Sequence, residues 1–247
     1  MISAIVLTKN EESNIKKCLD GILWCDEILV LDDFSQDKTV EISKKTGAKV
    51  FSRELNRNFS SQRNFGLSKA KCDWILFVDA DEIVSDNLKK EILNKISKNN
   101  DIGGFYLKRR DFIFGTEIKH GEFGGMKLLR LARVDAGSWK GNVHEEWKIA
   151  GKINELKNPL FHYPHQSINE FLKEINFYTD IRAKELFDMG VKSNLLSIIL
   201  YTKIKFIQNY FIRLGFLDGT KGLILALIMS FHSFLVRSKL WLLWHKK

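Results

Sequence analysis

The stretch Trp74-Ile75-Leu76-Phe77-Val78-Asp79-Ala80-Asp81-Glu82 decides how this chain is interpreted. Its first part is an unbroken apolar run of strand length, and its second part is acidic. Such a run is typical of a strand that is buried on both faces of a parallel sheet. We therefore expect a strand over Trp74–Val78, with Asp79 and Asp81 emerging at the edge of the sheet.

The residues before this stretch alternate between strand-like and helix-like patterns. Strands are predicted over Ile2–Leu7, Ile28–Leu31 and Lys49–Phe51. The helices predicted between them are marked by the apolar positions Ile15, Leu19 and Ile22, then Val40 and Ile42, and then the segment Phe59–Ala70. This alternation predicts a Rossmann-like half-sheet, in which ligands bind beyond the carboxyl ends of the strands.

Polar clusters also follow the first two strands. They are Thr8-Lys9-Asn10-Glu11-Glu12 and Asp32-Asp33-Phe34-Ser35-Gln36-Asp37-Lys38-Thr39. Each cluster taken singly has a structural explanation, because the first could cap a helix and the second could form Asx turns. Their place after successive strands favours a shared ligand site instead. The carboxylates of Asp79 and Asp81 could then bind one Mg²⁺ or Mn²⁺ ion that bridges to a diphosphate.

The remainder of the chain changes character twice. After a helix predicted over Asp86–Ser97, an antiparallel extension of the sheet is predicted by three segments, Gly104–Lys108, Lys127–Arg133 and Trp147–Ile149. From Ser167 to the end the pattern is helical. We therefore expect two regions, residues 1–165 and residues 166–247.

Three of these motifs together resemble the signature of family 2 glycosyltransferases with the GT-A fold. They are Ile5–Glu12, Val30–Thr39 and Phe77–Glu82. The resemblance covers roughly residues 1–165. It implies an α/β fold, with a Rossmann-like mixed sheet and flanking helices as the catalytic domain, followed by the helical C-terminal region.

The resemblance also implies roles for individual residues in a nucleotide-sugar site. Thr8 and Glu11 would line the nucleoside pocket, Asp33 would bind uracil, and Arg63 would face the nucleotide. Asp79 would approach the ribose and Asp81 would hold the metal. The full assignment to nucleotide-sugar binding is Thr8, Asn10, Glu11, Asp32, Asp33, Arg63 and Asp79, and the assignment to the metal is Asp79, Asp81 and His162.

A later segment, Trp139–Trp147, followed by Phe161-His162-Tyr163, resembles the branch that contains lipopolysaccharide-core β-1,4-glucosyltransferases. Inverting transfer needs a base that takes the proton of the acceptor hydroxyl, and a carboxylate suits this task. Glu145 is the candidate and Glu146 is the alternative, although both could be solvated acids on a strand edge.

Histidines near this segment could bind the metal or the diphosphate. His162 is the first candidate, ahead of His144 and His165. The Gln-x-x-Arg-Trp segment of processive family members is absent from the sequence, so transfer of a single sugar is expected.

The charge of the chain is concentrated at its C-terminus. The net charge is +9, and residues 201–247 carry six lysines and two arginines against one acid, Asp218. These cations flank apolar runs and not base-stacking aromatics, which favours a membrane surface and argues against nucleic acid. The longest uncharged run, Gly222–Val236, has 15 residues, which is shorter than the roughly 20 that a spanning helix needs. We expect interfacial helices; a packed helical subdomain or a homo-oligomer interface is the alternative.

The sequence opens without a secretory pattern, and its three cysteines lack the spacing of zinc or disulfide sites. We therefore expect a cytoplasmic protein that is peripheral on the inner face of the cytoplasmic membrane.

The expected function is inverting transfer of a single hexose from a UDP-sugar to a glycan or lipid-linked acceptor, of the lipopolysaccharide or cell-envelope type, with Mg²⁺ or Mn²⁺ as cofactor. Two alternatives remain. A sugar nucleotidyltransferase would need a Gly-rich phosphate loop after the first strand, yet no glycine precedes Gly21. A non-catalytic membrane-associated scaffold would leave the acidic clusters unexplained.

Overall fold

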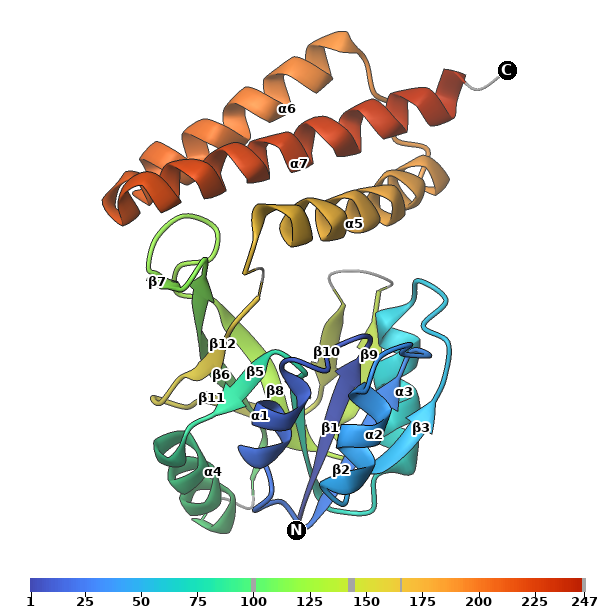
Figure 1. The fold of residues 1–247 in the computed structure, drawn as a ribbon, viewed down its shortest axis with the longest axis vertical. Helices are drawn as coiled ribbons and strands as arrows, with labels where there is room; N and C mark the ends of the chain where they lie inside the picture. Colours follow the sequence, from blue (N-terminus) through green and yellow to red (C-terminus); the bar gives the residue numbers. More distant parts are fainter. Residues whose placement is uncertain (99–100, 142–144, 165, 246–247) are drawn as a thin grey trace. The chain divides into compact units, whose positions relative to one another are not determined.

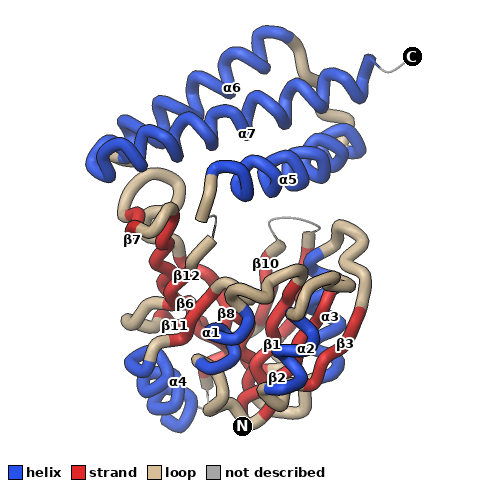
Figure 2. The backbone as a smooth tube through the Cα atoms, in the orientation of Figure 1, coloured by secondary structure: helices blue, strands red, loops and turns tan. Residues whose placement is uncertain are grey.

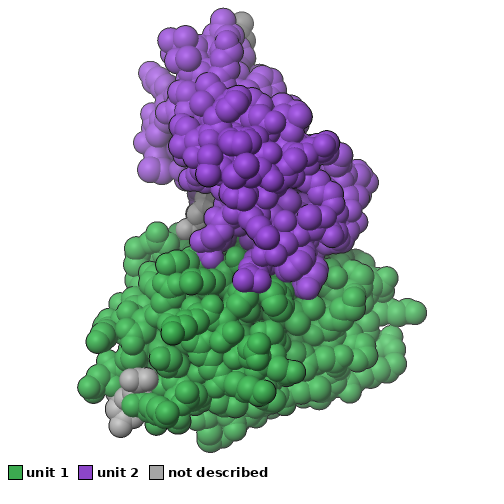
Figure 3. Space-filling view, turned by 90° about the vertical axis from the view of Figure 1, so that its left-hand side faces the viewer, with its two compact units in different colours: residues 1–109, 127–162 green, residues 110–126, 163–247 purple. Residues whose placement is uncertain are grey.

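The computed structural model describes residues 1–98, 101–141, 145–164 and 166–245 of the chain. It forms two compact units (Figure 3). Unit 1 comprises residues 1–109 and 127–162, and unit 2 comprises residues 110–126 and 163–247. Each unit is described by itself.

Unit 1 is built on the parallel strands that the sequence predicts. They are β1 (Ile2–Thr8), β2 (Glu27–Asp32), β3 (Lys49–Ser52) and β4 (Trp74–Asp79), and they lie in the order β3-β2-β1-β4. Four helices belong to the same unit, namely α1 (Ile15–Asp20), α2 (Thr39–Lys45), α3 (Phe59–Lys69) and α4 (Asp86–Lys98) (Figure 1). The expected α/β fold is confirmed.

The sheet continues beyond β4 with antiparallel strands, so it is mixed. β8 (Lys127–Arg133) pairs antiparallel with both β4 and β6 (Ile102–Ile113). Beyond β6 lies β12 (Leu160–His162), which pairs antiparallel with β5 (Glu82–Val84). The short strands β7 (Thr116–Ile118) and β11 (Lys152–Glu155) pair with β6, and β9 (Gly137–Lys140) pairs with β10 (Glu146–Ile149) in a separate ribbon (Figure 2).

The apolar run of β4 is unbroken because both faces of the sheet are covered. Leu76 and Val78 pack in one cluster with side chains of α1 and α4, whereas Ile75 and Phe77 pack in the other with side chains of α3 and the β9–β10 ribbon. Successive side chains of a strand point to opposite faces, so a strand covered on both sides must be apolar at every position.

Unit 2 contains the helices α5 (Ile168–Asp188), α6 (Leu195–Ile207) and α7 (Gly219–His245). A π-helical turn, η1 (Gln208–Ile212), and a 3₁₀ turn, η2 (Gly215–Asp218), connect α6 to α7. The N-termini of α5 and α6 are stabilised by capping boxes at Ser167 and Asn194. The helical pattern predicted from Ser167 onward is confirmed.

The segment Arg110–Met126 also belongs to unit 2, although the sequence analysis placed it in the region 1–165. Its Ile113 and Ile118 are buried against Phe171 of α5 and Leu225 of α7. A strand pattern states which face of a segment is apolar, but it does not state which element covers that face.

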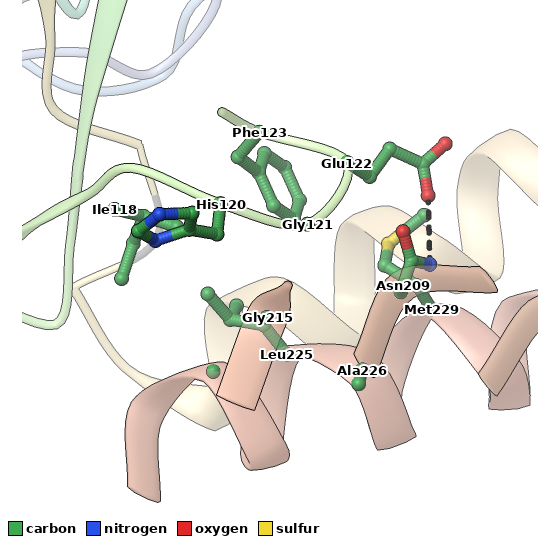
Figure 4. A pocket seen from close by; sticks show the side chains of 11 residues that line it. Ile118, His120, Gly121, Glu122, Phe123, Asn209, Gly215, Leu225, Ala226 and Met229 are labelled. Atoms are coloured by element: carbon green, nitrogen blue, oxygen red, sulfur yellow. Dashed lines mark hydrogen bonds between the residues drawn. The ribbon is translucent and has the colours of Figure 1, made fainter. Parts of the chain in front are cut away.

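The loop at the end of this segment is tied to the helices of unit 2 (Figure 4). Glu122 accepts a hydrogen bond from Asn209 and forms an ion pair with Lys205, at 2.8 Å between Nζ and Oε2. The backbone N–H groups of Lys119 and His120 donate to the carboxylate of Asp218. These contacts give the single acid of residues 201–247 a structural role. The cavity beside them has a volume of about 10 Å³.

The helix that runs from Gly215 to His245 is, by length and composition, apolar enough to cross a membrane. The uncharged run Gly222–Val236 is shorter than a span, but the helix as a whole is longer than that run. The same helix contributes Leu225, Ile228, Val236 and Leu240 to the two cores of unit 2.

Candidate active site

The carboxyl ends of β1, β2 and β4 lie side by side. Thr8 pairs in register with Asp32, and Leu7 pairs in register with Asp79. The three polar clusters of the sequence therefore meet at one edge of the sheet, where α/β folds bind ligands.

The clusters after β1 and β2 are joined by hydrogen bonds. The N–H of Asn10 donates to Oγ of Ser35 at 2.8 Å, and the N–H of Gln36 donates to Oδ1 of Asn10 at 2.8 Å. The N–H of Glu11 donates to Oγ1 of Thr39 at 2.7 Å. Asn10 therefore organises the loop, so its direct contact with a nucleotide stays a prediction.

Asp32 and Asp33 have different surroundings. Asp32 is buried and accepts the N–H of Ser35 at 3.1 Å, three residues on, whereas the Asx turn in this cluster is made by Asp37, which accepts the N–H of Thr39 at 3.0 Å. Asp33 accepts the N–H of Leu55 at 2.9 Å and pairs with Lys9 at 2.6 Å. Lys9 is 58% exposed, so its side chain can move aside for a ligand, although that of Asp33 is only 12% exposed. Asp33 is thus the more available of the two carboxylates.

Thr8 presents a buried hydroxyl beside these acids. Its Oγ1 has no hydrogen-bond partner among the residues that the structure describes. A buried polar atom without a partner is costly. It is therefore a natural contact for a ligand, in line with the predicted nucleoside pocket.

Asp79 is held by two arginines that come from different elements. Its Oδ1 accepts from Nη2 of Arg63 on α3 at 3.0 Å, and its Oδ2 accepts from Nη2 of Arg130 on β8. Burial alone would raise the pKa of Asp79, but Arg130 and then Arg63 outweigh it and hold this pKa well below its ordinary value. Asp79 is therefore a fixed anion, and its oxygens are already engaged by cations.

Arg63 links this anion to the candidate base. Its guanidinium is buried, and its Nε donates to Oε1 of Glu145 at 2.8 Å. The same group lies 4.7 Å from the ring centroid of Trp139 and 5.3 Å from that of Phe77. Its Nη1 is buried without a hydrogen-bond partner among the described residues. Arg63 therefore keeps one donor for a ligand.

The structure separates the two glutamates that the sequence left open. The side chain of Glu145 is 14% exposed and faces Arg63, whereas that of Glu146 is 66% exposed and pairs with Lys148. This geometry favours Glu145 as the base, although the role itself stays a prediction. His144 and His165 lie outside the described residues.

Asp81 contacts His162, and the pairing of β5 with β12 is the cause. His162 lies opposite Glu82 in that pairing, and its Nε2 is 3.1 Å from Oδ2 of Asp81. Burial alone would raise the pKa of Asp81, but the neighbouring His162 outweighs it and lowers this pKa. The carboxylate is therefore available as an anion.

The donors at this position fit a hard or borderline divalent ion only in part. Within the described residues, no group of three or more histidine, cysteine, aspartate or glutamate side chains is placed to hold a metal. Asp81 offers an anionic oxygen and His162 an imidazole nitrogen, while both oxygens of Asp79 carry arginines. Mn²⁺ accepts both donor types, and phosphate oxygens or water would complete its coordination.

Arg130 was not among the residues predicted for the site, and Glu82 was part of the acidic motif without an assigned role. Burial alone would lower the pKa of Arg130, but Asp79 and Glu82 outweigh it and raise this pKa. Glu82 is fully buried, accepts the N–H of Asp79 at 2.9 Å, and has its pKa raised by burial and then by Asp79. A signal for Arg130 existed, because it is the cation in the middle of the strand Lys127–Arg133, with apolar residues on both sides, and a buried cation there needs an anion as its partner.

We expect Arg130→Gln to lower the free energy of unfolding at pH 7 by about 3 kcal/mol, the low end for a buried pair that loses one partner, since Arg63 remains. Asp79 has a lowered folded-state pKa, so its stabilising contribution is present above its unfolded pKa of about 3.9 and is lost as the pH falls below that value. The difference between the wild type and the variant should therefore begin to shrink below about pH 4 and continue to shrink as the pH falls toward the lowered folded-state pKa of Asp79.

Urea unfolding across this pH range measures the effect of Arg130→Gln. Arg110→Gln is the matched control, because Arg110 forms an exposed ion pair with Glu117 at 3.5 Å. Its removal should cost less than about 1 kcal/mol. Equal losses in the two variants would contradict the buried role of Arg130.

Comparison with known proteins identifies the family of the chain. The model of the family described as glycosyl transferase family 2 matches residues 3–146. The chain belongs to glycosyl transferase family 2. The transferase is 31% identical to an uncharacterised glycosyltransferase of Rickettsia bellii, over 97% of this chain and 85% of that protein. It is 25% identical to the lipopolysaccharide core biosynthesis glycosyltransferase LpsC of Rhizobium meliloti, over 97% of this chain and 92% of that protein.

A solved structure shares the fold of the transferase. It is glucosyl-3-phosphoglycerate synthase from Mycobacterium tuberculosis in complex with Mn²⁺, UDP and glucosyl-3-phosphoglycerate, with a TM-score of 0.50 and 16% identity. The match covers 78% of this chain and 81% of that one. At this identity the likeness establishes the GT-A-like fold and not the ligands.

Proposed function

We propose that the transferase moves a single hexose, with inversion, from a UDP-sugar to a glycan or lipid-linked acceptor of the cell envelope. The observation that carries the proposal is the bridge made by Arg63, which joins Asp79 at the donor edge of the sheet to Glu145. The guanidinium of Arg63 thus contacts both Asp79, at the proposed donor site, and Glu145, the candidate base.

The nucleotide would bind across the ends of β1 and β2. Asp33 can accept from the uracil ring, and the buried hydroxyl of Thr8 supplies a contact that would otherwise be unsatisfied. Glu11 borders the same edge through its hydrogen bond to Thr39. These contacts recognise the nucleoside and leave the choice of sugar to other residues.

A divalent ion would be held by Asp81 and His162. When bound, such an ion would neutralise charge on the diphosphate and so make it a better leaving group. The solved structure with the shared fold carries Mn²⁺ and UDP, which supports the proposal of a divalent ion without choosing between Mg²⁺ and Mn²⁺.

Glu145 would accept the proton of the acceptor hydroxyl on the face of the sugar opposite the leaving nucleotide. Arg63 fixes its Oε1, so the carboxylate is held in one orientation. Arg63 and Arg130 add two buried cations beside the donor edge. Preorganised cations of this kind stabilise charge that develops on a departing diphosphate.

The acceptor class rests on the relative named for lipopolysaccharide core biosynthesis. The apolar helix Gly215–His245 and the cations of residues 201–247 are compatible with the proposed location, which is peripheral on the inner face of the cytoplasmic membrane. The proposed acceptors have in common a glycan that is attached to a lipid.

We expect metal-dependent hydrolysis of one UDP-sugar in a panel of nucleotide sugars, and loss of that activity when EDTA removes the metal. Restoring Mn²⁺ or Mg²⁺ should recover it. Release of the nucleoside diphosphate is the readout. Release of pyrophosphate from a nucleoside triphosphate would instead support a nucleotidyltransferase, and failure to bind any nucleotide with Mn²⁺ present would support a scaffold.

A further inference from the structure

Helix α6 is apolar, yet none of its residues is buried. Six large aliphatic side chains on it are between 43% and 72% exposed, namely Leu195, Leu196, Ile199, Leu200, Ile204 and Ile207. Most of them recur at spacings of three and four residues, which places them on one face of the helix. Continuous apolar surface of this kind marks an interaction site on a soluble protein.

The exposed surface continues into the turns that follow α6. Phe211, Ile212, Leu214, Phe216 and Leu217 are between 44% and 72% exposed. We call these residues, together with the exposed face of α6, the α6 surface. Its aromatic members suit the boundary between headgroups and acyl chains.

The charge around the α6 surface has a single sign. Residues 189–217 contain no aspartate or glutamate, but they contain Lys192, Lys203, Lys205 and Arg213. Lys205 is used internally, because it pairs with Glu122. Lys192, Lys203 and Arg213 are exposed and form no ion pair within the described residues. A matching partner would therefore be anionic.

This charge argues against a second copy of the chain as the partner. A twofold interface brings the same patch of both copies together, so the cations of one copy would face those of the other without an intervening acid. An anionic lipid surface instead offers acyl chains to the aliphatic residues and negative headgroups to the cations.

Helix α7 is poorly suited to cross the membrane, despite its length. Its Leu225 and Ile228 pack with Phe171 and Ile175 of α5, and Lys239 pairs with Asp180 of α5 at 2.7 Å. In addition, Oγ of Ser230 donates to the carbonyl of Thr202 on α6 at 2.6 Å. Insertion of α7 across a bilayer would break this core, whereas binding through α6 leaves it intact.

We propose that unit 2 binds anionic membranes in the plane of the interface through the α6 surface, while the inner face of α7 stays packed against α5 and α6. The proposal deepens the membrane location given under the proposed function and rests on it. The aliphatic residues of α6 enter the boundary of the acyl chains, and Lys203 and Arg213 contact the headgroups.

The test is sedimentation of the full chain with vesicles of phosphatidylcholine and phosphatidylglycerol, compared with vesicles of phosphatidylcholine alone. The variant Leu196→Ser with Ile204→Ser should bind the mixed vesicles more weakly by a factor on the order of 30, from the lost burial of two largely exposed aliphatic side chains. The variant Lys203→Gln with Arg213→Gln should lose about fivefold per residue on the mixed vesicles and almost nothing on the neutral ones.

Matched controls come from unit 1. Leu23→Ser with Leu93→Ser removes exposed leucines, and Lys98→Gln with Lys152→Gln removes exposed lysines. All four variants should keep the circular dichroism and the melting midpoint of the wild type, because the changed side chains are exposed. Deleting α7 would be a poor test, since it removes core residues.

Unchanged vesicle binding by both α6 variants, or equal losses in the controls, would overturn the proposal. Light scattering tests the alternative that the surface binds a second copy. That alternative would be supported if the wild type is a dimer, the Leu196→Ser, Ile204→Ser variant is a monomer, and both bind vesicles equally. Hydrolysis of the UDP-sugar should be equal in all variants. A wild type that binds vesicles but hydrolyses no nucleotide sugar would overturn the proposed function and leave the α6 surface in place.

Discussion

The variant Glu145→Gln is expected to lower kcat by a factor of about 10² to 10⁴ while donor and metal binding persist. Glutamine keeps the size of the side chain, and its amide oxygen can still accept the hydrogen bond that Nε of Arg63 donates at 2.8 Å. It cannot take the proton of the acceptor hydroxyl. The loss should therefore fall on the chemical step and not on the assembly of the site.

Single-turnover transfer measures the chemical step, and calorimetry of UDP with Mn²⁺ measures binding. Glu146→Gln is the matched control because its carboxylate is 66% exposed and pairs with Lys148, so its transfer rate should stay near that of the wild type. Wild-type transfer by Glu145→Gln would mean that the base is elsewhere, either at Glu146 or among the acids of residues 79–82.

The variant Asp81→Asn should fail in a different way. It removes an anionic oxygen from the proposed ion but keeps an amide that can contact His162, which lies 3.1 Å from the carboxylate in the wild type. We expect metal-dependent binding of UDP to weaken by at least about 10- to 100-fold, the usual effect of losing even an outer partner of a metal ligand. Turnover should fall with it.

Calorimetry of UDP, with Mn²⁺ and then with EDTA, isolates this effect. Asp135→Asn is the control, since Asp135 is an exposed acid of the same unit. Binding of UDP without metal should be the same in Asp81→Asn and the wild type. Normal binding of UDP and Mn²⁺ by Asp81→Asn would remove Asp81 from the metal site.

Much of the sheet edge that carries the candidate donor site could be predicted from sequence, because the apolar pattern of a strand indicates which of its faces are buried. β4 is apolar at every position before Asp79, so the sequence pattern predicts both the buried strand and the residue at which the chain leaves the sheet. The hydrogen bond from Ser35 to Asp32 and the Asx turn at Asp37 follow from local residues in the same way. Local hydrogen bonds and side-chain alternation need no knowledge of distant residues.

The partners of Asp79 could not be predicted in this way. Arg63 and Arg130 lie 16 and 51 residues away in sequence and belong to a helix and an antiparallel strand. The sequence analysis placed Asp79 in the metal site, whereas the structure surrounds it with two guanidinium groups. Whether Asp79 also contacts the ribose stays a prediction.

The boundary between the two units could not be predicted from the sequence either. Arg110–Met126 has the pattern of a β extension, and it does extend β6, but its buried Ile113 and Ile118 are covered by α5 and α7. Which element covers these two isoleucines is decided by how the folded segments pack. It depends on the shapes of surfaces that are far apart in the chain.

The sequence by itself determined the strands, the acidic clusters at their ends and the concentration of cations near the C-terminus, because periodicity, turn residues and composition are local properties. Only the tertiary structure decided that Glu145 and not Glu146 faces Arg63, that Asp81 meets His162, and that α6 has no buried residue while one face of α7 lies in the core. The physical reason is the same in each case. Burial and charge pairing are set by contacts between distant segments, and these exist only after the chain has folded.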